Sequence, residues 1–403
     1  MRALIPPSPL FPCLRPCLHQ RTVLLHRWVH EMADLLAIEE QTLPFYHRKR
    51  YYPVKPGETL KNLYRIIAKL GYGAYYTVWL AWDEKFVVHA ICIQTEDTEP
   101  SPILDEINML HRLKKFAEKD HPGLDFTRLA RDIFEIDGPS GSHYCIDFKP
   151  QGNSVRTLQK KFPNAQLHKL LVKSIIRRLF FAVNWLHATC GVAHTDISPE
   201  NVLMDIEDDT VLKHVEQQET ENPSTPITTG TGAAATTVYK TRPTMLELSG
   251  YPCLTDFGQM RVIEGRINQD WWMTDLYRAP EVLLQLPWGY PVDIWAIGVM
   301  GKNLFDPVDR VHGQYVLPLA LAQYIGYLRP PPLEIIQKSN LISEPPIPNI
   351  SLEEFVTTIP PGEEKDQFLR FIRILLTWDP EKRVTSIDGV PDEWLTRPVE
   401  GFM

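Results

Sequence analysis

A carboxylate followed five residues later by an asparagine stands near the middle of the chain, in the run HTDISPEN at 194–201. In a catalytic loop with this spacing the carboxylate, here Asp196, accepts the proton of a substrate hydroxyl, and the asparagine, here Asn201, holds a magnesium ion. Asp256 opens the run DFG and supplies a second magnesium carboxylate on a flexible turn. The three residues predict a site for phosphoryl transfer, with Asn201 and Asp256 as the metal ligands.

A glycine-rich run, GYGAYYTV at 71–78, lies between two segments that are typical of strands. Gly71 and Gly73 would let the backbone approach nucleotide phosphates, and Val78 could cover an adenine ring. Alone the pattern is weak, because a GxG between strands is more often an ordinary hairpin. The third glycine position of such a loop holds Tyr76.

The elements that must position these residues change in type along the chain. Residues 64–70, 77–82 and 86–94 are rich in β-branched and aromatic residues and predict strands. Residues 103–116 have apolar residues at helical spacing, and most later segments are helical, among them 166–188, 317–327 and 365–378. A β-rich first part and a larger helical part predict an α+β fold of two lobes with a cleft between them.

Further motifs follow in a fixed order. The run YRAPE at 277–281 would end a segment docked on the helical lobe, and Arg383 is placed to pair with Glu281. Asp293 opens a further helix of this lobe. All of these motifs in this order by chance would be very improbable, so the sequence predicts the protein kinase fold. In that fold the helix continues past Met300, but here the chain runs directly into Gly301, so we expect a truncated helix, through either a real deletion or an error in the gene model.

The runs GYGAYYTVWLAWD, SHYCIDFKPQGNSV, HTDISPEN and LYRAPEVLL resemble the SR-protein kinases, particularly fungal-type members. The similarity extends from about residue 36 to 400 and implies a small N-lobe at 46–150 and a C-lobe at 151–403. It also implies binding of ATP and Mg²⁺ and phosphorylation of serines in arginine/serine-rich splicing factors. In the nucleotide cleft it implies roles for Ala90 on the third strand, Glu106 on the first helix, Phe148 as gatekeeper and Gly152 in the adenine pocket.

Two lysine positions of this family hold other residues. The third strand reads Ala90-Ile91-Cys92, so the lysine that would neutralise the α- and β-phosphates and pair with Glu106 is missing. Ser198 stands where a lysine steadies the transferring phosphate. Removing one preorganised electrostatic group typically lowers the rate about 10²–10³-fold. The alternative to an active serine/threonine kinase is therefore a pseudokinase or scaffold with weak or no phosphoryl transfer.

Switching by phosphorylation of the activation segment is not expected. Thr195 replaces the arginine that would read such a phosphate, and Thr274 is the only serine or threonine between Asp256 and Glu281. Thr274 matches the threonine that contacts the catalytic aspartate.

The net charge and the hydrophobicity of the chain indicate which partners and which cellular compartment to expect. The net charge of −8 argues against direct nucleic-acid binding, and no apolar run is long enough to cross a bilayer. The basic leader at 1–45 is either disordered or a targeting segment. We expect a monomer in the cytoplasm, the nucleus or both, or in mitochondria if that leader is a presequence. Residues from about 207 to 247 are rich in Thr, Pro, Gly and Ala and predict a disordered insertion.

Overall fold

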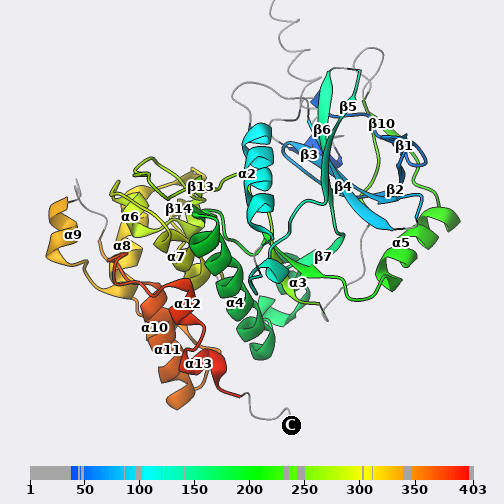
Figure 1. Ribbon diagram of the computed structural model, residues 1–403. Coiled ribbons are helices and arrows are strands. Elements are labelled where there is room, and N and C mark those ends of the chain that lie inside the picture. The colour runs from blue at the N-terminus through cyan, green and yellow to red at the C-terminus, as the bar shows by residue number, and fades with distance from the viewer. Residues whose placement is uncertain are drawn as a thin grey trace, which may run out of the picture.

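The computed structural model describes residues 38–43, 46, 50–85, 87–95, 102–118, 120–139, 141–229, 236–242, 250–301, 304–310, 312–338 and 346–398. A sheet-rich lobe and a helical lobe lie next to each other (Figure 1), so the predicted two-lobed fold is confirmed. Most of the predicted leader lies outside the described residues, and its role in targeting stays a prediction. Within the described residues no helix is long and apolar enough to cross a membrane.

The N-lobe is a six-stranded antiparallel sheet in the order β1-β2-β3-β4-β6-β5. Its strands are β1 Thr59–Leu60, β2 Tyr64–Gly73, β3 Tyr76–Trp82, β4 Val88–Gln94, β5 Asp132–Asp137 and β6 Ser142–Phe148. Every residue of β4 is buried, which explains why its sequence is almost continuously apolar. Helix α2, Pro102–Phe116, packs beside the sheet through buried Ile103, Ile107 and Leu110.

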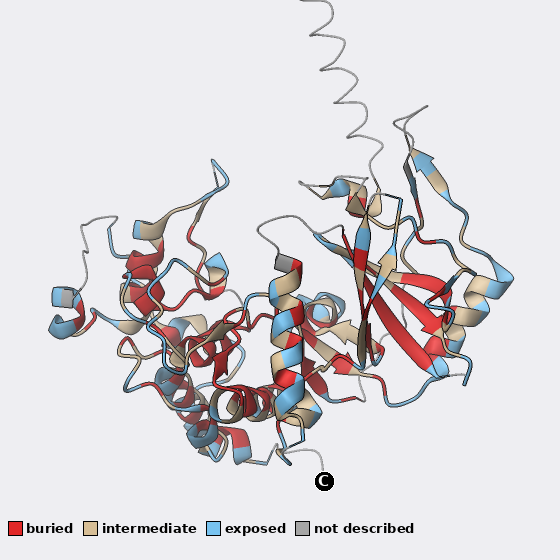
Figure 2. Cartoon of the chain, turned by 45° about the horizontal axis from the view of Figure 1, so that its top comes forward, coloured by how far each residue is buried: buried red, intermediate tan, exposed pale blue. Residues whose placement is uncertain are grey.

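The C-lobe is built from helices around one large apolar core. The longest are α4 Lys169–Asn184, α8 Leu317–Leu328 and α11 Glu363–Leu375, and the shorter ones are α3 Val155–Lys161, α6 Pro280–Leu283, α7 Pro291–Val299, α9 Leu333–Lys338, α10 Leu352–Phe355, α12 Ser386–Gly389 and α13 Glu393–Thr396. Short strands β7 Gln151–Ser154, β9 Val202–Asp205 and β12 Pro252–Leu254 form a sheet beside the connection between the lobes. Figure 2 shows the buried residues concentrated inside both lobes.

Helix α7 is short, as its sequence predicts, and aromatic rings from the chain that follows it pack against it in the core. After Val299 the chain turns, and Phe305 returns to stack on Trp295 with ring centroids 5.8 Å apart. Tyr324 of α8 packs against both rings, at 5.2 Å from Trp295 and 4.0 Å from Phe305. These contacts replace packing that a longer helix would supply.

The prediction of a disordered insertion at about 207–247 is wrong for much of this segment. Residues Thr210–Glu221 form helix α5, and Ile227–Thr229 pairs with Thr236–Val238 as the hairpin β10–β11. The polar composition conceals an apolar face, because Val211, Leu212 and Val215 lie on one side of α5 and are buried. Residues 230–235 and 243–249 lie outside the described residues.

The insertion packs on the N-lobe rather than on the lobe from which it emerges. Leu212 and Val215 join Ile67 and Leu80 of the sheet in one buried cluster, and α5 lies beside β2 (Figure 1). Tyr239 contacts the ring of Trp79 edge to face, with centroids 6.1 Å apart.

A buried lysine joins three parts of the chain at the outer face of this sheet. The ammonium group of Lys69 on β2 pairs with Glu40 and, at 3.4 Å, with Glu39, both in the short helix η1 Glu39–Thr42. It also donates to the carbonyl of Tyr239 in the insertion at 3.1 Å. The backbone N–H of Arg242 donates to the carbonyl of Lys69 at 2.8 Å. The N-terminal segment and the insertion are thus fixed to one point of β2.

Candidate active site

The catalytic loop lies between β8 Val192–Ala193 and β9, and Asp293 at the start of α7 holds it in place. The carboxylate of Asp293 accepts the backbone N–H groups of His194 and Thr195, each at 2.7 Å, and the ring N–H of His187 at 2.8 Å. Burial alone would raise the pKa of Asp293, but these donors hold that pKa below its ordinary value. The loop is therefore anchored to the helical lobe by a buried, charged carboxylate.

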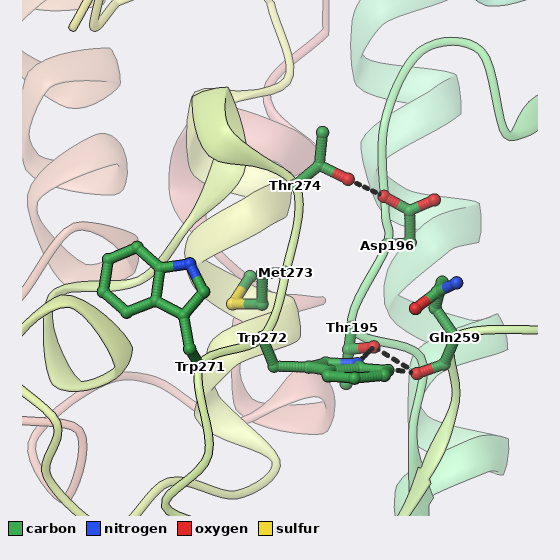
Figure 3. Close-up of a pocket in the computed structure, with 7 residues that line it drawn as sticks. All are labelled: Thr195, Asp196, Gln259, Trp271, Trp272, Met273 and Thr274. Atoms are coloured by element: carbon green, nitrogen blue, oxygen red, sulfur yellow. Dashed lines mark hydrogen bonds between the residues drawn. The ribbon is translucent and has the colours of Figure 1, made fainter. Parts of the chain in front are cut away.

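Both carboxylate oxygens of Asp196 are held by donors. The hydroxyl of Thr274 donates to Oδ1 (Figure 3). Nδ2 of Asn201 donates to Oδ2 at 2.8 Å. Asn201 also donates to the carbonyl of Asp196 at 2.9 Å. The predicted contact between Thr274 and the catalytic aspartate is confirmed, and Asp196 and Asn201 lie together.

Asp256 faces Asp196 across the same site. The backbone of Asp256 has φ 67°, and the following Phe257 is buried with its ring 5.6 Å from that of His194. Burial and then the charge of Asp196 raise the pKa of Asp256, while His194 and the N–H of Gly258 oppose the change. Carboxylates that repel each other in this way, beside an amide, form an oxygen-rich donor set suited to Mg²⁺. Asn201 and Asp256 would hold the ion, so these residues fit a divalent cation.

An aromatic pocket of about 200 Å³ opens beside Asp196. Its lining residues are Thr195, Asp196, Gln259, Trp271, Trp272, Met273 and Thr274 (Figure 3). The indole N–H of Trp272 donates to the hydroxyl of Thr195 and to the carbonyl of Gln259, both at 2.9 Å. Sequence reasoning missed Trp271 and Trp272; two adjacent tryptophans just before Thr274 were the available signal.

The end of the activation segment is fixed by the predicted ion pair between Glu281 and Arg383. The two side chains are buried and joined by two hydrogen bonds of 2.7 and 3.0 Å. Arg383 also donates to the carbonyls of Pro291 and Thr377, both at 2.8 Å. This prediction is confirmed.

On the N-lobe side of the cleft, the sheet brings together the residues that were predicted to face the adenine. Val78 pairs with Cys92 across β3 and β4, and Ala90 pairs with Phe148 across β4 and β6. Because side chains alternate along a strand, Val78, Ala90, Cys92 and Phe148 share one face of the sheet. Gly152 lies on β7, four residues after Phe148.

Glu106 of α2 reaches this face without a cationic partner from β4. In the described part of the chain, the side chain that hydrogen-bonds to it is Gln94, whose amide donates at 3.3 Å. Burial and the charge of Asp256 raise the pKa of Glu106 to about 7, opposed by Arg128 and by the Gln94 hydrogen bond. The amide of Gln94, which is neutral, thus contacts the carboxylate that a lysine at position 92 would neutralise in a kinase.

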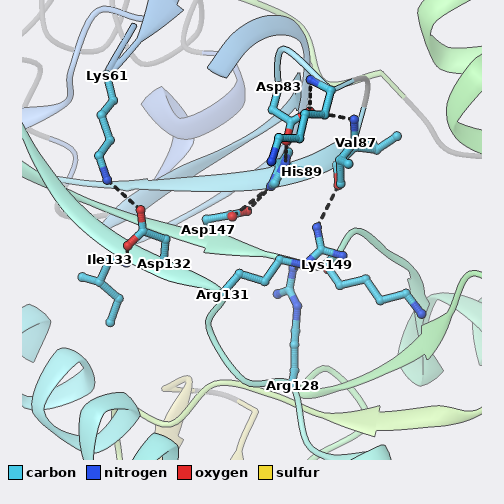
Figure 4. Close-up of polar contacts among 12 residues, drawn as sticks. Lys61, Asp83, Val87, His89, Arg128, Arg131, Asp132, Ile133, Asp147 and Lys149 are labelled. Atoms are coloured by element: carbon cyan, nitrogen blue, oxygen red, sulfur yellow. Dashed lines mark hydrogen bonds and ion pairs between the residues drawn. The ribbon is translucent and has the colours of Figure 1, made fainter. Parts of the chain in front are cut away.

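Arg128 is a further residue near this cluster that sequence reasoning missed. Its guanidinium carbon lies 4.2 Å from the centroid of the Phe148 ring. Its Nη2 donates to the carbonyl of Lys149 at 3.4 Å, and Figure 4 draws both Arg128 and Lys149. Burial lowers the pKa of Arg128. Arg128 is therefore directed to the gatekeeper and the hinge.

In the glycine-rich turn, a tyrosine ring lies against one of the two glycines. Gly71 and Gly73 lie at the end of β2, and a Cβ placed on Gly73 would stand 2.6 Å from the ring of Tyr76. Cys92 and Ser198 supply no positive charge. The residues present therefore fit the metal ion, whereas the phosphates of ATP would find no lysine at either of these positions.

The comparisons with known proteins agree with this geometry. The protein kinase domain family matches residues 240–395. A serine/threonine protein kinase of Aspergillus fumigatus is 30% identical over 381 residues, which cover 89% of this chain and 91% of that protein. The chain belongs to the SR-protein kinase-like serine/threonine protein kinases.

Two further relatives show the range of this similarity. The kinase is 25% identical to the serine/threonine-protein kinase SRPK of Physarum polycephalum, over 91% of this chain and 93% of that protein. It is 32% identical to protein kinase dsk1 of Schizosaccharomyces pombe, over 52% of this chain and 38% of that protein. The resemblance inferred from the motifs is confirmed.

Proposed function

We propose that this kinase phosphorylates serines in arginine/serine-rich proteins, splicing factors among them, with ATP and Mg²⁺. The observation that carries the proposal is the arrangement of Asp196, whose two carboxylate oxygens are held by Thr274 and Asn201. A carboxylate oriented in this way can accept the proton of a serine hydroxyl. ATP, when bound, supplies the phosphoryl group.

The residues around Asp196 also suit a polypeptide substrate. The pocket beside it opens between Trp271 and Trp272, and Trp271 is 43% exposed. A chain with net charge −8 attracts basic partners. The relative named SRPK in Physarum polycephalum supports the arginine/serine-rich class of substrate.

A scaffold or pseudokinase role is the second candidate, and the polar contact of Glu106 favours it. That carboxylate is joined to Gln94 instead of a lysine, and Ser198 is buried at the other lysine position. With these charges missing, the kinase would bind partners but transfer phosphate weakly or not at all.

A transfer assay separates the two candidates. The full chain is incubated with Mg²⁺, ATP and an arginine/serine repeat peptide, and compared with Asp196→Ala and with the surface variant Glu381→Ala. We expect transfer by the wild type and by Glu381→Ala, and none by Asp196→Ala.

A lysine/serine repeat peptide of equal charge tests the substrate class. We expect it to be a poorer substrate, because an ammonium group lacks the planar hydrogen-bonding and stacking surface of a guanidinium. Wild-type transfer no greater than that of Asp196→Ala would exclude the kinase proposal and leave the scaffold role.

A further inference from the structure

Tyr76 stands at the third glycine position of the glycine-rich turn, and its side chain faces the nucleotide cleft. It pairs with Gln94 across β3 and β4, two residues before Val78 pairs with Cys92. Because side chains alternate along a strand, Tyr76 lies on the same face as Val78 and Cys92. That face carries the adenine-facing residues and, further along, the contact between Gln94 and Glu106.

The ring of Tyr76 fills the hollow beneath the glycine-rich turn. A Cβ on Gly73 would lie 2.6, 2.8 and 3.0 Å from three ring carbons of Tyr76, distances that real Cβ atoms do not show or scarcely tolerate. A Cβ on Gly71 would have nothing within 4 Å. The glycine at 73 therefore leaves space that a tyrosine ring takes up, rather than a phosphate.

The hydroxyl of Tyr76 is close enough to Cys92, Asp256 and Glu106 for their charges to act on it. Burial raises the pKa of this hydroxyl well above its ordinary value, and the neighbouring Cys92, Asp256 and Glu106 raise it further. The ring packs against the large core cluster that contains Cys92, Phe148 and Phe257. The Tyr76 side chain thus packs against residues of both lobes, at the nucleotide cleft between them.

A second tyrosine holds the turn from the other side. The hydroxyl of Tyr51 donates to the carbonyls of Gly73 and Ala74, at 3.2 and 2.9 Å. These bonds tie the turn to the N-terminal segment, so the turn does not lift freely away from the Tyr76 ring.

We propose that Tyr76 occupies the phosphate subsite, so that the cleft as folded takes an adenine nucleoside and admits a triphosphate only after the ring swings out. The adenine-facing residues Val78, Ala90 and Phe148 are in place. The inference rests on the nucleotide cleft of the proposed kinase. A triphosphate entering now would meet the ring and the carboxylates of Glu106 and Asp256. Among the described residues, the cation that acts on this cluster is Arg128, whose guanidinium is turned to the Phe148 ring and to the carbonyl of Lys149.

Ligand binding tests this directly. Dissociation constants of adenosine and of Mg²⁺–ATP are measured by calorimetry for the wild type, Tyr76→Gly and Tyr76→Phe. We expect the wild type to bind the two ligands within about threefold of each other, because the phosphates gain no net contact. Tyr76→Gly should bind Mg²⁺–ATP about tenfold tighter or better, with adenosine unchanged, since it opens the subsite. Tyr76→Phe should match the wild type, because the ring and not the hydroxyl is the obstacle.

Several results would overturn the inference. One is that the wild type binds Mg²⁺–ATP at least about tenfold tighter than adenosine. Another is that the ratio of the two dissociation constants is the same in Tyr76→Gly as in the wild type. The third is that the wild type binds neither ligand. The wild-type ratio needs no variant, so a misfolded Tyr76→Gly would still leave a decisive measurement. Because the assay requires no turnover, its failure is distinct from a failure of phosphoryl transfer.

Discussion

The hydroxyl of Thr274 donates a hydrogen bond to Oδ1 of Asp196, which joins the activation segment to the catalytic loop. This bond keeps one carboxylate oxygen oriented while the other is held by Asn201. It also explains why the activation segment keeps a threonine at this position although it has no other serine or threonine.

Replacing Thr274 by valine should slow phosphoryl transfer. A hydrogen bond to a charged group contributes about 1.5–3 kcal/mol, so we expect kcat to fall roughly 10–100-fold with little change in the KM for peptide. Thr274→Ser keeps the hydroxyl and serves as the control. Steady-state kinetics on the arginine/serine peptide give both constants; equal kcat values for the valine and serine variants would contradict the role of this bond.

The raised pKa of Glu106 predicts a loss of stability at higher pH. The pKa rises from 4.5 to about 7 on folding, so the contribution of this group is fully present below about pH 4.5 and is lost as pH rises through 7. The shift corresponds to roughly 3 kcal/mol.

Urea unfolding at pH 5 and pH 8 measures this effect. Glu106→Gln should remove that part of the pH dependence, and Cys92→Lys should also reduce it by supplying a cation. Cys92→Met, which adds volume without charge, is the matched control. A pH profile of Glu106→Gln identical to that of the wild type would show that another group is responsible.

Removing only one partner of the ion pair between Glu281 and Arg383 should strongly destabilise the fold. Arg383→Met leaves the carboxylate of Glu281 buried without its cation, which typically costs about 3–5 kcal/mol. In the double variant Arg383→Met, Glu281→Leu we expect part of this loss to return. Recovery stays incomplete because the carbonyls of Pro291 and Thr377 keep no donor. Urea unfolding gives the free energy of unfolding of the single and the double variant. A loss of less than about 1 kcal/mol in Arg383→Met would contradict the predicted cost of the unpaired carboxylate.

Lys69→Met should release the N-terminal segment and the insertion from the N-lobe. The change leaves Glu40 buried and unpaired and removes the donor to Tyr239, so we expect a loss of about 3 kcal/mol or more. Limited proteolysis followed by mass spectrometry should show several-fold faster cleavage within 210–242. Lys85→Met, at an exposed lysine, should be cleaved at the wild-type rate.

The catalytic half of the site could be predicted from the sequence because its spacing is local. Asp196 and Asn201 belong to one loop, so five positions along the chain already fix their relative placement. Glu281 and Arg383 are far apart in the chain and were predicted from motif order, which the fold then satisfied.

The nucleotide half depended on tertiary packing that motif reading did not capture. Strand alternation from Val78 could have placed Tyr76 in the cleft, but not shown that its ring reaches the space beside Gly73. Helix α5 escaped prediction because three apolar residues within a polar segment do not by themselves indicate a surface on which to pack.

The docking of the insertion changes the mechanics of the molecule. The chain leaves β9, is fastened to β2 through α5 and the Lys69 contacts, and comes back to β12, the strand next to β9. A rotation of the N-lobe that moves β2 away from β9 would therefore strain residues 206–209, the described span between β9 and α5. Opening beyond the reach of this span would require α5 to detach from the sheet.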